Sequence, residues 1–478
     1  MLDFKSQTMK KTLRYIFVLF LIGGVSSCKD YFDLDSNPNL VVNPPLNALL
    51  STTTQRTGLN SQRVANITSY FVQYLANPGT GASTDTYQIT DYTSTWDNLY
   101  FAMADIYDMK AKAQAEGSSE HAGVANVLMS YNLTLVADLF GDAPYSEAFG
   151  GTTLTPKYDT EEELYAESLR LLDEGIAELA KTDSKVKLSA SDDFIHHGVL
   201  ANWTKTAYAL KARLLNKVSK KPDYNPAAIL DAISKAYTSN AGDAQMSGFL
   251  GLNPWASIAL SNTQLVLGGW LSEQFMQHIN GDSYGVLDPR ITKITNRTSN
   301  GDYKGTPNGA GNVGTVSNTV PDETYITRTS PLTGDAAPII LVSFAELKMI
   351  EAEANFRSGN PAAAFTAYRA GIAAHMDKLG VTPAERDAYL ASAAVAQDAS
   401  AFMLDQIFQE KYIITYLNPE AWNDARRYDY KYKNFTLPVN AALPTFIRRV
   451  SYPVGETSKN GSNVPAVGSL SDRLWWDE

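Results

Sequence analysis

Residues 343–363 read SFAELKMIEAEANFRSGNPAA, and their pattern indicates two helices joined by a tight turn. Ser343 and Glu346 have the spacing of residues that cap a helix at its start. Gly359 is the residue type that commonly ends a helix, because it adopts left-handed backbone angles without strain. Asn360 and Pro361 then begin the second helix, as an N-cap followed by a proline in the first turn.

The tetrapeptide Asn-Pro-Ala-Ala occurs twice, at 225–228 and at 360–363. Each copy opens the second helix of a predicted hairpin, which gives a weak internal repeat similar to tetratricopeptide stacking. Chance reuse of good capping residues would produce the same pair. The clearest single helix is 161–180, where Thr160 and Glu163 form a capping box. Further helices are expected from about 46, over 96–115, 121–139, 203–219 and 225–237, and over 401–416.

Long stretches between these helices have the opposite character. Residues 296–338 hold six glycines, many Thr and Asn residues and no periodic pattern. Such stretches in a compact protein are usually functional loops or disordered segments. Tyr303 and Tyr325 lie within them and favour ordered loops. We therefore predict a mainly α fold, one body of residues 46–478, with a tetratricopeptide-like helix-pair scaffold at about 46–76, 96–240 and 341–430 and a large irregular ligand-binding face from loop-rich regions at about 77–95, 241–340 and 431–478.

The first 28 residues have the layout of a bacterial lipoprotein signal peptide. Three cations precede eleven mostly apolar residues, which are followed by two serines and Cys28. Eleven residues are too few to cross a bilayer, which needs about 20. Cys28 stands where a lipid is attached after cleavage. We predict a signal peptide over 1–27 and a lipid-anchored extended lead over 28–45. A signal peptide with an incidental thiol and a buried cysteine are the alternatives.

Composition narrows the function further. The formal net charge is −11, and an acidic body repels phosphate backbones, so nucleic-acid binding is not expected. Cys28 is the only cysteine, so the fold must rest on packing without a disulfide. No stretch after the signal peptide approaches 18 uncharged apolar residues, and no later membrane-spanning helix is expected. The expected membrane attachment is therefore through acyl chains on Cys28.

The sequence contains no recognisable catalytic motif. A Gly-x-Ser-x-Gly elbow, a His-Glu-x-x-His motif and a phosphate-binding Gly-rich loop before Lys-Ser/Thr are all missing. The five histidines are scattered, so neither a metal site nor a cofactor is expected. Carboxylate pairs are abundant in an acidic chain, which leaves a glycosidase pair open without favouring it. We therefore predict a binding protein rather than an enzyme.

Aromatic residues beside amides and acids on loops are suited to polyhydroxylated ligands. A flat ring covers the C–H face of a sugar, and polar side chains meet its hydroxyls. Core packing explains each aromatic residue at least as well, and Trp96 and Trp270 are favoured because they border loops. The candidate ligand-binding residues are Tyr92, Trp96 and Asn98 after the first loop, and Trp270, Tyr284, Asp288 and Arg290 before the second.

Several short motifs follow one another along the chain. They are Cys28 with Asn37-Pro38-Asn39, Phe140–Ala148, Leu287–Arg290, Glu346–Ala354, Ile407–Tyr416 followed by Glu420–Arg427, Arg448–Glu456, and the ending Arg473–Asp477 with its tryptophan pair. Single motifs are weak, but their order and spacing over most of the chain resemble the SusD/RagB family of Bacteroidetes nutrient-binding lipoproteins. The ending is similar to that of a SusD-like subgroup.

This resemblance implies a helical scaffold that carries an irregular ligand-binding face. It also implies an outer-membrane lipoprotein facing the cell exterior, which acts as a lid on a SusC-type TonB-dependent transporter. The family binds glycans in most cases and peptides in some, and its ligand residues vary, so only the lipidated Cys28 transfers. We predict capture and delivery of an oligosaccharide. The alternatives are a peptide-binding member of the family, a lipid-anchored glycan-acting enzyme, and a helical scaffold that binds only proteins.

Overall fold

The computed structural model describes residues 43–263, 268–314 and 322–478. The chain divides into two units, Met1–Pro45 and Leu46–Glu478, and the second unit is the body described below. The predicted signal peptide, Cys28 and all but the end of the predicted lead lie outside the described residues.

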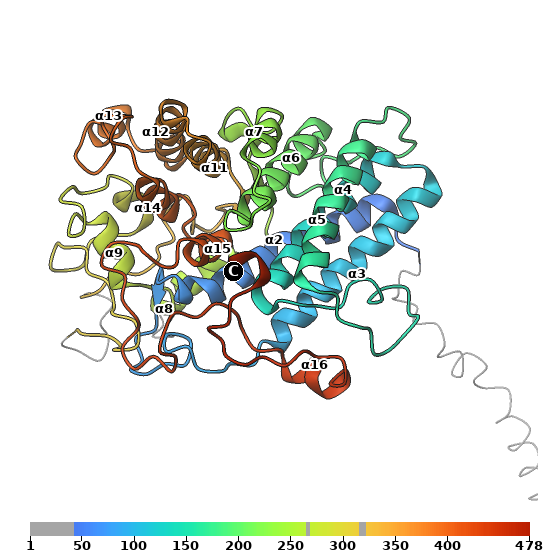
Figure 1. The fold of residues 1–478 in the computed structure, drawn as a ribbon, viewed down its shortest axis with the longest axis horizontal. Coiled ribbons are helices and arrows are strands. Elements are labelled where there is room, and N and C mark those ends of the chain that lie inside the picture. The colour runs from blue at the N-terminus through green and yellow to red at the C-terminus, as the bar shows by residue number, and fades with distance from the viewer. Residues whose placement is uncertain (1–42, 264–267, 315–321) are drawn as a thin grey trace, which may run out of the picture. The chain divides into compact units, whose positions relative to one another are not determined.

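The body is mainly helical, as predicted (Figure 1). Its helices are α2 (Leu46–Phe71), α3 (Thr93–Glu116), α4 (Ser119–Phe140), α5 (Glu161–Leu179), α6 (Leu200–Lys217), α7 (Pro226–Ser234), α8 (Pro254–Thr263), α9 (Glu273–Ile279), α10 (Ile291–Ile294), α11 (Phe344–Arg357), α12 (Pro361–Leu379), α13 (Pro383–Leu390), α14 (Leu404–Ile414), α15 (Glu420–Arg427) and α16 (Val454–Lys459), with single 3-10 turns at Asn240–Gly242 and Trp475–Asp477. The strands are β1 (Leu75–Ala76), β2 (Ala244–Met246), β3 (Trp270–Leu271) and β4 (Ile339–Val342).

The scaffold is a row of helices in which each packs against the next. Helices α3, α4, α5, α6 and α7 follow one another, α7 packs against α11, and α12 and α13 continue the row (Figure 1). The two Asn-Pro-Ala-Ala copies have the same role in two neighbouring hairpins. The side-chain oxygen of Asn225 accepts a hydrogen bond from Ala228 N–H at 3.1 Å, and that of Asn360 accepts one from Ala363 N–H at 3.3 Å. The predicted helix-pair repeat is therefore confirmed.

Helix α5 begins with the predicted capping box, since Thr160 and Glu163 each accept a hydrogen bond from the backbone N–H of the other. Its close neighbour is α4, and the contact needs glycine on both sides. A Cβ on Gly123 would lie 2.6 Å from the Leu179 side chain, and one on Gly175 would lie 3.2 Å from the Gly123 carbonyl. Among the described helices, α4 alone has the length and apolar composition of a membrane-spanning helix, but most of it is buried inside the body.

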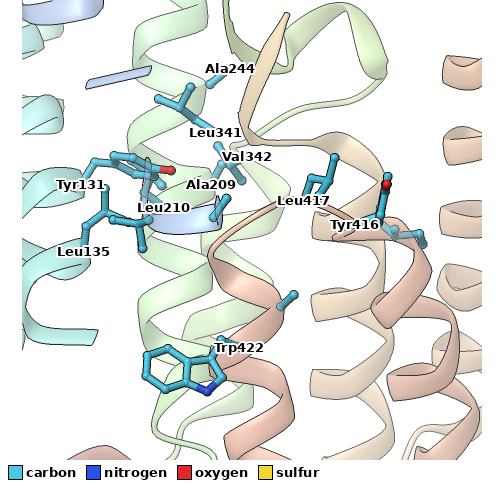
Figure 2. Close-up of a cluster of buried hydrophobic side chains, with 14 of the residues drawn as sticks. Tyr131, Leu135, Ala209, Leu210, Ala244, Leu341, Val342, Tyr416, Leu417 and Trp422 are labelled. Carbon is cyan, nitrogen blue, oxygen red and sulfur yellow. The ribbon is translucent and has the colours of Figure 1, made fainter. Parts of the chain in front are cut away.

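One hydrophobic core extends through most of the body, and Figure 2 shows part of it. Helices, strands and a connecting segment far apart in the sequence supply its members. Trp422 of α15 packs against Phe71 of α2 with ring centroids 5.0 Å apart. Other members of this part of the core are Tyr131 and Leu135 of α4, Ala209 and Leu210 of α6, Ala244 of β2, Leu341 and Val342 of β4, and the α14–α15 connection residues Tyr416 and Leu417.

Buried ion pairs between residues far apart in the sequence also join the scaffold. Arg427 contacts Glu353 at 2.7 Å and Asp424 at 2.7 Å, and all three side chains are buried. Arg213 contacts Glu346 at 2.6 Å in the same way. Burial raises the pKa of Glu346 and Asp424. Burial would also raise the pKa of Glu353, but the Arg427 charge holds it well below its ordinary value.

The loop-rich regions contain more regular structure than the sequence predicted. Strand β1 pairs with β3, and β2 pairs with β4, both antiparallel. Helices α8, α9 and α10 lie within 241–340, and α16 lies within 431–478. Each of these helices is 10 residues or shorter, which leaves too few turns for an apolar period to be recognisable. Helix α3 starts at Thr93, three residues before the expected start.

Candidate ligand-binding cleft

A cleft of about 560 Å³ lies in the loop-rich region. Helix α9 and the turn after it form one wall, and the segment Arg297–Gly305 forms the other. In Figure 1, α9 lies among the loops, on the other side of the view from α3 and α5. The lining of the cleft is mostly polar. The lining residues are Glu273, Met276, Gln277, Asn280, Asp282, Leu287, Arg297, Gly301, Asp302, Tyr303, Lys304 and Gly305.

The α9 wall is held by the strand that precedes it. Strand β3 pairs with β1, and the Ser272 hydroxyl then caps α9 by accepting a hydrogen bond from Gln274 N–H. The Glu273 N–H donates to the Thr306 carbonyl at 2.9 Å, which joins the start of α9 to the other wall. A Cβ on Gly305 would lie 2.5 Å from the Glu273 backbone, so only glycine permits this close approach.

The opposite wall is a tight turn with its own internal contacts. Thr298 N–H donates to the Asp302 carbonyl at 2.9 Å, and the Thr298 hydroxyl donates to the Asp302 carboxylate. The Arg297 guanidinium donates to the Gly301 carbonyl at 2.6 Å and lies over the Tyr303 ring, 4.6 Å from its centroid. A carbonyl group and an aromatic ring, rather than a carboxylate, therefore hold the Arg297 guanidinium in place at the cleft.

Asn280 connects the two walls. Its side-chain amide donates to the Asp282 carboxylate at 2.9 Å and to the Tyr303 carbonyl at 3.2 Å. The end of α9 and the 297–305 turn therefore hold a defined spacing, and the cleft between them is formed before any ligand arrives. Preorganisation of this kind reduces the entropy lost on binding.

The cleft is lined by charged side chains of both signs. Glu273, Asp282 and Asp302 supply carboxylates, and Arg297 and Lys304 supply cations. Within the described ranges, none of these five makes an ion pair at 4.0 Å or less. Gln277 adds an amide and Leu287 a partly exposed apolar side chain to the lining. The cleft can thus donate and accept hydrogen bonds around a polar ligand and cover one apolar edge of it.

The predicted residues Asp288 and Arg290 lie beside this cleft in sequence but face the scaffold. Arg290 is completely buried and contacts Asp288 at 2.6 Å and Glu410 of α14 at 2.7 Å. Burial raises the pKa of Glu410, and the positive charge of Arg290 offsets part of this increase. The ion pair anchors the loop after α9, and Leu287, just before it, lines the cleft. The structure thus gives Asp288 and Arg290 internal partners, and their ligand role stays a prediction.

Trp270 and Tyr284, the two aromatic residues predicted beside the second loop, also make internal contacts. Trp270 of β3 is 1% exposed and its ring lies 6.4 Å from that of Tyr325. Tyr284 is half-buried, and its hydroxyl lies 3.0 Å from the Nε2 atom of the buried His278. Burial lowers the pKa of His278 to about 3, so the imidazole is neutral. Neither ring lines the cleft.

The first predicted cluster lies at the start of α3, and its central ring is in the core. Trp96 is 5% exposed and packs against Tyr100 at 4.8 Å and Phe140 at 5.0 Å between ring centroids. Tyr92 is half-buried, and burial raises its pKa to about 12. The Asn98 side chain donates to the Ser94 carbonyl at 2.7 Å within the helix. The structure therefore favours packing, rather than ligand contact, for Trp96.

The cleft lies within the loop-rich region that the sequence predicted, but none of the predicted ligand-binding residues lines it. The sequence does contain a pattern that marks both walls of the cleft. Asn-Gly-Asp occurs at 280–282 on one wall and again at 300–302 on the other. Gly281 and Gly301 both have positive φ, +103° and +83°, so each tripeptide is a tight turn. The aspartate of each turn, Asp282 and Asp302, lines the cleft.

The chain belongs to the SusD-like family. The family model described as "Starch-binding associating with outer membrane" matches residues 38–453. Members of this family are binding proteins of the outer membrane rather than enzymes, so the chain is a binding protein. No curated protein matches the chain.

Solved structures of the same fold extend over nearly the whole chain. A SusD/RagB family protein from Bacteroides thetaiotaomicron is 21% identical, with a TM-score of 0.74 over 91% of this chain and 99% of that one. A chitin-binding SusD homolog from Flavobacterium johnsoniae is 23% identical, with a TM-score of 0.77 over 90% and 98%. A chitin-binding protein is 22% identical, with a TM-score of 0.75 over 91% and 100%. These similarities establish the fold.

Proposed function

We propose that this protein is a cell-surface lipoprotein, anchored in the outer membrane through acyl chains on Cys28, that captures an oligosaccharide in the α9 cleft. It then delivers the sugar to a SusC-type TonB-dependent transporter. Membership of the SusD-like family supports the location and the general role. The observation that carries the binding assignment is the cleft itself, whose five charged side chains make no ion pair within the described residues.

The size and chemistry of the cleft suit a sugar. Its volume of about 560 Å³ lies within the range of about 300–1,000 Å³ that small-molecule sites occupy. Sugar hydroxyls both donate and accept hydrogen bonds, and the cleft offers the carboxylates of Glu273 and Asp302 as acceptors and Lys304 as a donor. Two proteins of the same fold bind chitin, which makes N-acetylglucosamine oligomers the first probes to test.

A peptide is the second candidate ligand, because the cleft carries both signs of charge. An extended peptide with cationic and anionic groups could pair with Asp282 on one wall and Arg297 on the other. Ionic strength separates the two candidates. Coulomb attraction between exposed charges is screened within about 8 Å at physiological salt. Peptide affinity should therefore fall steeply with added salt, whereas neutral-sugar affinity should change little.

The binding test is a calorimetric titration of the purified protein with hexasaccharides of different linkage and with charged peptides. Glu273→Gln and Lys304→Ala change cleft side chains that have no ion-pair partner, so both variants should fold normally. Each should lower affinity for the true ligand by about tenfold. The matched controls are Glu162→Gln on the exposed face of α5 and the exposed Lys431→Ala, which should bind like wild type. Equal affinity in all four variants would show that the ligand binds elsewhere.

The anchor is tested separately from binding. Cys28→Ala should abolish lipidation and surface display while the body still folds, because Cys28 lies outside the body of residues 46–478. Protease treatment of intact cells, followed by fractionation, measures both effects. A variant that remains membrane-bound and equally accessible would place the anchor elsewhere. Co-purification of the wild-type protein with a large transporter tests the delivery step.

A further inference from the structure

A second site, remote in sequence from the cleft, begins with a rigid loop between α4 and α5. The Asp159 carboxylate accepts hydrogen bonds from the backbone N–H groups of Tyr145 and Ser146 at 2.9 and 2.7 Å, and from the Ser146 hydroxyl at 2.6 Å. Tyr100 of α3 donates its hydroxyl to the Pro144 carbonyl at 2.7 Å. Burial opposes ionisation of Asp159, but these hydrogen bonds lower its pKa below the ordinary value. The loop is therefore held in one conformation.

The same loop completes a strip of three aromatic rings that begins on α3. The Tyr107 ring stacks on Phe149, with centroids 5.5 Å apart and planes at 21°. Phe149 in turn meets Tyr145 edge-on at 5.9 Å. Tyr107 is 42% exposed although one of its faces is covered by Phe149. A substantial part of its ring surface is thus open to solvent.

The strip leads to a cavity of about 390 Å³ between the loop and α5. Tyr145 and Leu164 supply apolar surface to this cavity. Its carboxylates are held in place, since Glu167 accepts two hydrogen bonds from Arg170 and Glu163 caps α5 through Thr160. The cavity-lining residues are Tyr145, Ser146, Lys157, Asp159, Glu163, Leu164 and Glu167.

We propose that this strip and cavity form a second binding site for a neutral oligosaccharide. The exposed Tyr107 ring covers the C–H face of one sugar ring, and the side chains around Tyr145 meet the hydroxyls of the next. Three carboxylates and one lysine line the cavity, which makes it net negative and unsuited to phosphorylated or sulfated ligands. The proposal extends the proposed function, because a polysaccharide held at two places is retained longer than at one.

This site is independent of the α9 cleft. The two cavities share no lining residue, and α5 and α9 lie on different sides of the view in Figure 1. A short oligosaccharide should therefore bind twice to one molecule. The second event should depend on Tyr107 and not on Glu273 or Lys304.

Calorimetric stoichiometry tests the proposal, with chitohexaose, xylohexaose and maltohexaose as probes. Tyr107→Ala should reduce the number of bound hexasaccharides from two to one, or weaken the second by at least tenfold. Lys157→Ala, at the cavity rim, should weaken the same event. The matched control is Phe101→Ala, a 57% exposed aromatic residue on the same helix, which should retain both events. Thermal melts confirm that each variant is folded.

The outcomes separate this proposal from the cleft assignment. If Tyr107→Ala and Lys157→Ala bind every probe with wild-type affinity and stoichiometry, the second site does not exist. If the wild-type protein binds none of the three probes at millimolar concentration, it is likewise overturned. If Tyr107→Ala removes all binding while Lys304→Ala removes none, the second site stands and the cleft assignment fails.

Discussion

The scaffold and the cleft use the same kinds of charged residue in opposite ways. Arg427 and Glu353 are buried between α11 and α15 and contact each other at 2.7 Å. Arg297 and Glu273 line an open cleft, and neither has an ion-pair partner among the described residues. Burying a charge is unfavourable unless it is paired, so the scaffold pairs are required by folding. The exposed cleft charges need no ionic partner for folding, which leaves them available to a ligand.

The two regions use aromatic residues in a similar way. Trp96 and Trp422 have rings enclosed by other rings and side chains of the core. Tyr303, which lines the cleft, is also mostly buried, at 9% exposed, and the Arg297 guanidinium lies over its ring. The charged and polar side chains, rather than the aromatic ones, therefore distinguish the cleft from the scaffold. Substitutions in the two regions should separate stability from binding.

The largest expected effect is that of Arg427→Ala. The substitution removes the cation that Glu353 and Asp424 share, and leaves Glu353 with only Arg357 and Asp424 with only Lys411. This loss should lower the free energy of unfolding by about 3–5 kcal/mol. Arg297→Ala is the matched change in the cleft and should lower the free energy of unfolding by no more than about 0.5 kcal/mol. Urea unfolding of both variants measures the difference. Similar losses in the two variants would contradict the division between the regions.

Trp96→Ala should have a comparable but purely packing-based effect. Truncating a buried tryptophan leaves a cavity against Tyr100 and Phe140 and should destabilise the protein by about 3–5 kcal/mol. Affinity for the ligand should not change. A thermal melt and a titration on the same variant test both statements. If the variant lost affinity while its melting temperature stayed unchanged, Trp96 would be a ligand-binding residue.

A pH effect should come from Asp85, which is buried under the loop face. Its carboxylate accepts hydrogen bonds from the Asn77 and Gly309 N–H groups at 2.9 and 3.0 Å. Burial nevertheless raises its pKa to about 6. The folded state therefore keeps a proton that the unfolded chain releases near pH 4. The stability due to Asp85 is present below that pH and is lost as pH rises through about 6.

The size of this effect is at most on the order of 3 kcal/mol between pH 4 and pH 8. Four of the histidines have pKa values lowered by burial, and they oppose it by destabilising the fold at low pH. Comparing Asp85→Asn with wild type removes the histidine contribution, because both proteins contain the same histidines. Its stability relative to wild type should rise from pH 4 to pH 8 in urea titrations. A pH-independent difference between Asp85→Asn and wild type would contradict the assignment.

The smallest effect on stability is expected from the cleft variants. Glu273→Gln and Lys304→Ala remove unpaired surface charges, so the free energy of unfolding should change by no more than about 0.5 kcal/mol. Their affinity for the ligand should fall by about tenfold. Melting curves and titrations on the same preparations compare the two quantities. A large loss of stability in either variant would place that side chain in the scaffold group.

The sequence by itself determined the helical scaffold. Capping boxes, the two Asn-Pro-Ala-Ala turns and the apolar period of α5 are local signals, carried by residues a few positions apart. The order of motifs along the chain also indicated the SusD-like family, which the match over 38–453 confirms. The lipidated Cys28 and the signal peptide before it stay predictions, because they lie outside the described residues.

Tertiary structure alone decided which residues of the loop-rich regions meet. The sequence placed the cleft region within 241–340, but not which side chains face it. Neighbours in sequence can face opposite ways: Leu287 lines the cleft while Asp288 turns inward to Arg290. The partner that holds Arg290 inside, Glu410, is 120 positions away. Exposure depends on such distant contacts, and no local pattern encodes them, because a buried pair and a ligand-binding pair use the same residues.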